Sequence, residues 1–180
     1  MKYLVVLLMY LSLWTCAATS KTEDLTQIAA ENHQLADLVA GIQDKHPSRY
    51  LELAGILFQQ GYKRQAVKWF YVGQIRYRAY LKARPDLDPS ADAALFASLM
   101  DTLGRPLNEY IAGDVDEWVE VINQAIDWHH SHADGFLGKA SNQAVYAAVL
   151  NGLVGMRDHI AVNKDAIRRQ RVENGLQNRE

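Results

Sequence analysis

The chain has 180 residues, of which 49% are hydrophobic and 22% are charged, a balance that suits one globular domain with its own buried core. Its 19 Lys and Arg residues against 21 Asp and Glu residues leave a net charge of −2. This argues against a nucleic-acid partner, because phosphate binding needs a clustered positive field. The single cysteine, Cys16, excludes an intramolecular disulfide, so the core has to be stable without a covalent cross-link.

The first eighteen residues predict an export signal. Lys2 precedes twelve mainly apolar residues, 3–14, and the small residues Ala17 and Ala18 follow. The apolar run falls short of the roughly 20 residues that span a bilayer, but it suits the apolar region of a signal peptide. We therefore expect residues 1–18 to be removed and the remaining chain to be periplasmic.

The end of this segment admits two interpretations. Cleavage after Ala18 leaves a chain without cysteine and a net charge of −3, since Lys2 is the only charged residue that is removed. Alternatively, residues 13–16 resemble the bacterial lipobox, in which case Cys16 carries a lipid. Lipidation at Cys16 is the only basis on which the sequence predicts contact with a membrane.

The first half of the remaining chain is expected to form three helices, because its apolar residues recur at spacings of three and four. The first runs from residue 22 to about 44 and is stopped by Pro47. The second begins at Ser48, a good N-cap, and ends at Gly61. The third covers residues 63–84.

The second half predicts further helices around the same core. Ser90 is expected to cap a helix that Gly104 closes, and Pro106 to open a short turn. Asp114 with Glu117 has the spacing of a capping box. After a polar stretch, a long last helix carries an apolar stripe of Val149, Leu153, Met156, Ile160 and Ile167.

No alternation of Val, Ile and Thr between hairpin turns predicts a strand. The predicted fold class is therefore all-α, with antiparallel helical hairpins packed as a single helical domain over residues 22–180.

Residues 48–84 resemble a tetratricopeptide hairpin. The pattern consists of a small residue in the first helix, a turn glycine, and a small–aromatic–small set in the second helix, here Ala54, Gly61, Ala66, Phe70 and Gly73. The run of residues 66–70, Ala-Val-Lys-Trp-Phe, is also similar to Sel-type repeats. Only one copy is present, whereas a solenoid needs about three. The resemblance implies a helical hairpin and, by analogy, a protein-binding surface.

A cluster of imidazoles and carboxylates over residues 127–134 offers the one candidate for metal chemistry. Its members are Asp127, His129, His130, His132 and Asp134. The spacing does not match a helical zinc motif, in which two histidines stand four apart, and the dipole of a helix C-terminus also favours histidine. We therefore predict no metal site, and keep His129, His130 and His132 as the candidates if one exists.

The sequence carries no catalytic signature. It has no nucleophile elbow, zincin motif or phosphate-binding glycine loop, so we predict neither an enzyme nor a cofactor. An aromatic concentration at Trp69, Tyr71, Tyr77 and Tyr80 is interpreted as core packing, with a ligand site as the alternative.

Two acidic groups are candidates for contacting a partner protein, although helix N-termini and solvated loops also favour acids. They are Asp86 and Asp88 in a proline-bounded loop, and Asp114, Asp116, Glu117 and Glu120 at one helix start. The final residues are rich in Asn, Gln and Arg, which predicts that side-chain hydrogen bonds tie the last helix to the body.

The leader, the hairpin and the helical remainder together resemble the periplasmic immunity proteins of type VI secretion effectors. That resemblance implies an exported module that binds and blocks an antibacterial toxin. Two alternatives stay open. One is a small envelope enzyme or metal-binding protein that uses the residue 127–134 cluster, and the other is a scaffold for envelope assembly.

Overall fold

The computed structural model describes residues 25–30 and 32–179. The predicted signal peptide and Cys16 lie outside these ranges. All regular elements within them are helical, which confirms the all-α class. The main helices are α1 (Leu25–Ala30), α2 (His33–Val39), α3 (Ser48–Gln59), α4 (Lys63–Ala83), α5 (Ala94–Ile111), α6 (Val115–Ser131), α7 (Gln143–Val162) and α8 (Lys164–Glu173), with short helical turns η1 (Ile42–Asp44), η2 (Pro89–Ala93) and η3 (Ala140–Asn142).

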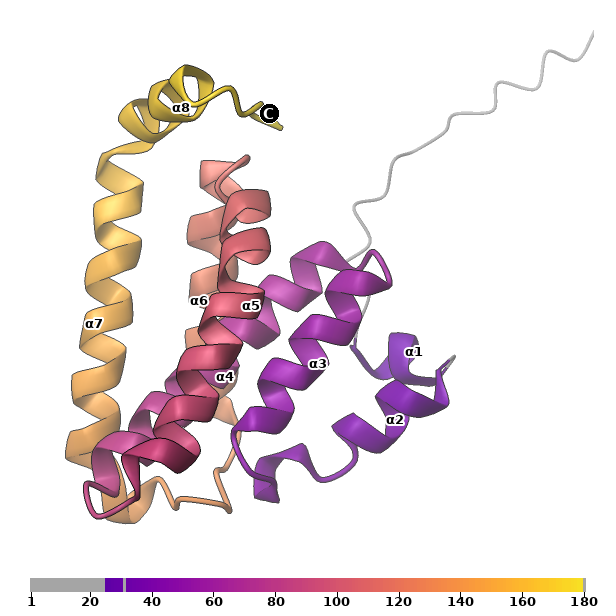
Figure 1. Cartoon of the computed structure of the whole chain (residues 1–180), viewed down its shortest axis with the longest axis vertical. Helices are drawn as coiled ribbons and strands as arrows, with labels where there is room; N and C mark the ends of the chain where they lie inside the picture. Colours follow the sequence, from indigo (N-terminus) through magenta and orange to yellow (C-terminus); the bar gives the residue numbers. More distant parts are fainter. Residues whose placement is uncertain (1–24, 31, 180) are drawn as a thin grey trace, which may run out of the picture.

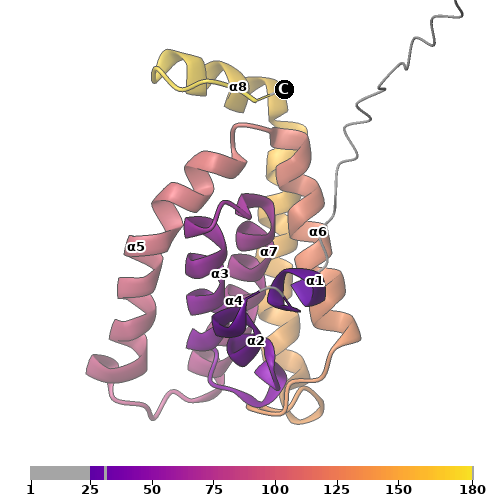
Figure 2. The ribbon, with the colours of Figure 1, turned by 90° about the vertical axis from the view of Figure 1, so that its right-hand side faces the viewer.

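Helix α4 is the centre of the domain. It contacts α3, α5, α6 and α7, while α1 and α2 cover the side of the molecule opposite α7 (Figure 1). Helix α8 crosses the end of the bundle at which α5 stops and α6 starts (Figure 2). None of the helices in the described ranges combines the length and apolar character needed to cross a membrane.

The sequence of α4 explains its central place, because buried side chains point from it in almost every direction. The aromatic residues of this helix are core residues, which confirms that interpretation over a ligand site: Trp69, Tyr71, Tyr77 and Tyr80 are 3%, 2%, 0% and 8% exposed. Tyr71 accepts a hydrogen bond from Trp118 Nε1 at 2.7 Å. The central helix is thereby joined to α6.

Helices α3 and α4 form the predicted hairpin. Gly61 turns the chain with φ of 90°, a conformation that favours glycine. Ala54 and Ala66 are fully buried, and at Gly73 the two helices meet directly. A Cβ atom placed on Gly73 would stand 2.7 Å from Leu51 Cδ2 and 3.1 Å from Tyr50 Cβ. Small residues therefore do allow the close approach that the pattern implies.

The single helix predicted over residues 22–44 is wrong. The chain forms α1 and α2 instead, because the side chain of Asn32 accepts hydrogen bonds from the amides of Gln34 and Leu35 and so caps a new helix. Ser48 is not the cap of α3 either. Pro47 stands at the N-cap and has no side chain that can cap, and the ring of His46 before it accepts from the Ser48 amide through Nδ1 at 3.2 Å.

Helix α5 also differs from the prediction, because it continues through both residues that were expected to break it. Gly104 is buried and faces Phe70, and a Cβ atom there would lie 3.6 Å from the Phe70 ring. Beyond Pro106, Leu107 and Ile111 are 1% and 0% exposed, so core packing holds the last turns in helical form. Ser90 does not cap α5, which begins without a side-chain cap; Asp88 caps the preceding turn η2 by accepting from the amide of Ser90 at 2.8 Å.

The last two helices are separate where one was predicted. Asn163 ends α7, since its side-chain amide donates to His159 O at 2.7 Å, and α8 leaves at a new angle (Figure 1). The predicted start of α6 is confirmed, because Asp114 accepts from the amide of Glu117 at 2.9 Å. The reciprocal half of the capping box does not form, as the Asp114 amide donates to Ile111 O.

The close approach at Gly73 gives a paired prediction. Gly73→Ala is expected to lower the free energy of unfolding by about 1–3 kcal/mol, because the methyl group forces α3 and α4 apart. Gly152→Ala on α7 meets no atom within 4 Å and should instead add about 0.5–1 kcal/mol through helix propensity. Urea unfolding followed by circular dichroism measures both, and a Gly73→Ala protein as stable as the parent would contradict the packing argument.

Candidate functional site

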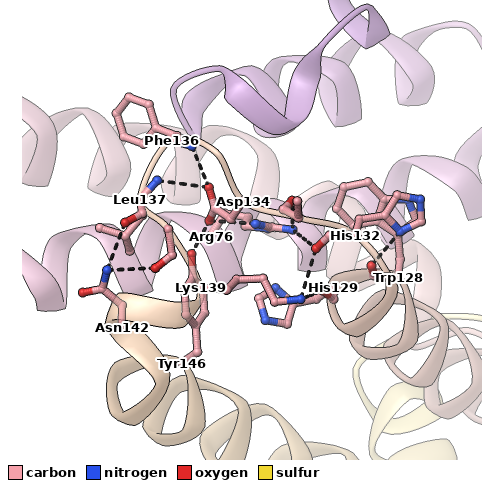
Figure 3. A network of polar contacts seen from close by, with 12 residues as sticks. Arg76, Trp128, His129, His132, Asp134, Phe136, Leu137, Lys139, Asn142 and Tyr146 are labelled. Carbon is pink, nitrogen blue, oxygen red and sulfur yellow. Dashed lines mark hydrogen bonds and ion pairs between the residues drawn. The ribbon is translucent and has the colours of Figure 1, made fainter.

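A buried ion pair lies where the loop between α6 and α7 meets α4. Arg76 and Asp134 are 1% and 7% exposed, and Arg76 Nη1 stands 2.7 Å from Asp134 Oδ2 (Figure 3). Arg76 Nη2 also donates to the carbonyls of His132 and Ala133 at 3.2 and 2.9 Å. One guanidinium thus holds both a carboxylate and the backbone at the end of α6.

The loop folds around this pair. Tyr146, from the first turn of α7, donates its hydroxyl to Asp134, and the amides of Phe136 and Leu137 donate to Asp134 Oδ1 at 3.2 Å each. Lys139 Nζ donates to three carbonyls at the end of α6, those of His129, His130 and His132. Burial acts to raise the pKa of Asp134, but the hydrogen bonds from Tyr146 and Arg76 outweigh it and lower that pKa, so the carboxyl is ionised.

The histidines of the residue 127–134 cluster point to different places. His129 is 1% exposed, and burial, followed by the charges of Arg76 and Lys139, lowers its pKa to about 3. His132 stacks on Trp128 with the rings 4.2 Å apart, while His130 is exposed. Among the described residues no three His, Cys, Asp or Glu side chains converge as metal ligands. The geometry gives the metal-binding alternative no support, and it is the Asp134 side chain of this cluster that holds the loop in place.

The acidic residues at the start of α6 bind cations of the chain itself. Asp116 accepts from Lys164 and, at 3.0 Å, from Arg168, and the hydrogen bond from Lys164 is the main cause of its lowered pKa. Glu117 pairs with Arg179 at 2.6 Å. These carboxylates fasten α8 and the residues after it to the bundle. Arg64 adds a third link on the same surface, at 2.9 Å from Glu120.

The other predicted acids also have local partners. Asp86 lies 3.2 Å from Arg84, and Asp88 caps the turn before α5. The predicted attachment of the C-terminal residues is confirmed, because Arg171 and Arg179 donate to the carbonyls of Glu109 and Tyr110 at 3.0 and 3.1 Å. Partner binding by either acidic group stays a prediction, but Asp86, Asp116, Glu117 and Glu120 each already pair with a cation of this chain.

The sequence analysis missed the surface formed by α7. No Asp, Glu, Lys or Arg occurs between Lys139 and Arg157, yet only Tyr146 and Ile160 of this helix are buried. Its apolar stripe is only partly covered, with Val149 and Leu153 half-buried and Met156 36% exposed. The signal was the absence of charge on every side of the helix from residue 143 to 156, which predicts burial on more than one side.

A groove runs between this helix and α4. One hollow of about 280 Å³ is lined by Gln74, Ile75, Arg78, Val149, Gly152, Leu153 and Met156. A second hollow of about 490 Å³ shares Arg78 and Val149 with the first and extends to Leu81, Lys82, Phe96 and Ala148. The two hollows adjoin at these shared residues, and we call them together the α4–α7 groove. It is the best candidate for a functional site in the part of the chain that the structure describes.

The buried ion pair can be tested by a double-mutant cycle. Asp134→Ala is expected to cost about 3–5 kcal/mol of unfolding free energy, because it leaves the Arg76 cation buried without its partner. Arg76→Met combined with Asp134→Ala should lower the unfolding free energy by less than the sum of the two single changes, since the double variant leaves no buried cation without a partner. Urea unfolding of the four proteins measures the coupling, and additive costs would show that the pair does not act as a unit.

The environment of His129 predicts a specific pH dependence. Its pKa is about 3 in the folded protein and about 6.5 when unfolded, so between these values the unfolded chain binds one more proton and stability falls as the pH falls. From pH 7 to 5 the parent protein should lose roughly 1–2 kcal/mol more than His129→Leu does. Urea midpoints at several pH values measure this. His130→Leu, which removes the exposed neighbour, is the control, and parallel profiles for the parent and His129→Leu would refute the assignment.

Comparison with known proteins provides no relative from which to transfer a role: no family model, curated protein or solved structure matches this chain. The tetratricopeptide and immunity-protein resemblances therefore stay predictions.

Proposed function

We propose that this protein is an exported protein-binding module and that it binds its partner with the outer face of α7 and the α4–α7 groove. One observation carries the proposal, namely that α7 has no charged residue from position 143 to 156 and yet has one buried side chain in that span. A helix that is apolar all round is normally buried, and this span is apolar apart from Gln143, Tyr146 and Asn151. An apolar surface that the domain leaves uncovered marks a site of contact with another molecule.

The acidic start of α6 is a weaker candidate for the same role. Asp116, Glu117 and Glu120 each lie within ion-pairing distance of a cation of this chain. A partner that used them would have to displace Lys164, Arg179 or Arg64 first. The α4–α7 groove needs no such exchange, so it is the surface that we assign to the partner.

The more specific role that we propose is that of a periplasmic immunity protein, which covers the active cleft of an incoming toxin. The leader-like segment with Lys2 and the apolar residues 3–14 supports export. The hairpin resemblance over residues 48–84 supports a protein partner. A stable complex of this kind needs about 800 Å² of surface from each protein, with aromatic or large apolar anchors at its centre.

Site-specific photo-crosslinking in the native host tests the binding role. A photoreactive phenylalanine analogue at Ala148 should yield one adduct with another polypeptide, whereas the same analogue at the exposed Arg169 on α8 should not. The absence of any adduct from α7 positions in cells that meet competing bacteria would reject a partner at this face.

Competition between cells tests the immunity role. A strain lacking this protein should be killed by its parent on contact, and survival should return with the full chain but not with a version that lacks residues 2–18. Survival of the deletion strain, or rescue by the leaderless version, would rule out a protective role in the envelope.

A further inference from the structure

The α4–α7 groove has the length of a short helix. Its walls run from Gln74 to Lys82 on α4 and from Ala148 to Met156 on α7, each a rise of about 12 Å. The floor is apolar, with Ile75 buried and Val149 and Leu153 half-buried. An amphipathic helix of two to three turns would place its apolar stripe on this floor, as in the helix-in-groove mode of recognition.

The side chains on the α7 side of the groove are small enough for another helix to approach closely. Gly152 lines the groove, and a Cβ atom built on it meets no atom within 4 Å. Ala148, one turn earlier, is exposed and lines the neighbouring hollow. With small side chains at both positions, the backbone of an incoming helix can lie directly against α7.

The rim of the groove carries positive charge only. Arg78 and Lys82 are exposed on the α4 side, and no carboxylate occurs among the residues that line either hollow. The Arg78 guanidinium lies 5.2 Å from the ring of Phe96, and its hydrogen bond goes to the neutral side chain of Gln74. A ligand that carries carboxylates along one edge would complement this rim.

We propose that the α4–α7 groove binds an amphipathic helix of the partner protein whose apolar stripe is flanked by acidic residues. The proposal rests on the protein-binding function and names the chemistry of the segment that is recognised. The apolar stripe contacts Val149, Leu153 and Met156, and the acidic flank faces Arg78 and Lys82. A second copy of this chain is a poor occupant, because a symmetric contact across α7 would bring these cations toward their own equivalents.

A defined probe tests this assignment. A fluorescent helical peptide of about 14 residues, with leucine at spacings of three and four and glutamate on the flanks, should bind the purified protein saturably in fluorescence anisotropy. Affinity should fall as salt is added, since the ionic contacts are exposed. The same peptide with lysine in place of glutamate should not bind.

Two pairs of variants locate the binding. Gly152→Leu fills the groove and should weaken peptide binding by about tenfold or more, whereas Gly155→Leu, on the same helix but outside both hollows, should leave it unchanged. Arg78→Glu with Lys82→Glu should weaken binding similarly. The control for that pair is Arg105→Glu with Arg169→Glu, which reverses two exposed cations on other helices. Thermal unfolding of each variant confirms that it is folded.

Each alternative result has a defined meaning. Equal loss in Gly152→Leu and Gly155→Leu, or equal binding of the lysine peptide, would overturn the acidic-helix assignment. Concentration-dependent dimerisation that Gly152→Leu abolishes would overturn it in favour of a second copy. If the native partner captured by crosslinking still binds Gly152→Leu, the groove assignment fails while the protein-binding function stands, and if no partner is captured the function itself fails.

Discussion

The placement of α7 depends on the buried ion pair between Arg76 and Asp134. This helix has two buried side chains, and its other contacts with the core are made by partly buried apolar residues: Val145, Val149, Leu150, Leu153 and Val154. Tyr146, one of the two, donates to Asp134, which is in turn fixed by Arg76 on the central helix. The first turn of α7 is thereby joined to the middle of α4 through a dry polar network, where electrostatic interactions are strong.

Polar contacts at two further places hold the rest of that helix, one on α7 itself and one on α8. Arg157 donates to the side chain of Asn123 on α6 at 3.0 Å. At its far end, α8 is held across the bundle by the contacts of Lys164 and Arg168 with Asp116, and α8 itself buries no residue. Hydrogen bonds and ion pairs thus place α7 while its apolar side chains remain available at the surface. The buried polar groups of this protein therefore stabilise the fold and also hold α7 in the position in which its surface is exposed.

Local patterns in the sequence predicted most of the helices. Two failures came from local caps that the prediction overlooked, at Asn32 and Asn163, and the others came from non-local contacts. The hairpin at Gly61 and the cap at Asp114 depend on neighbouring residues, so they could be read directly. The continuity of α5 could not, because burial of Leu107 and Ile111 outweighs the local cost of Pro106. The pairing of Arg76 with Asp134 joins positions far apart in the chain, and neither residue has a local feature that identifies its partner. The exposure of α7 was likewise hidden, since an apolar stripe looks the same whether this chain or another molecule covers it.

One glycine on α7 also bears on how such a protein changes over generations. Gly152 supports nothing inside the fold, as a side chain there would meet open space. A replacement there alters the outline presented to a partner without disturbing the hydrophobic interior. Selection can therefore redirect what this protein recognises one residue at a time, with little of the folding penalty that usually slows the divergence of a binding surface.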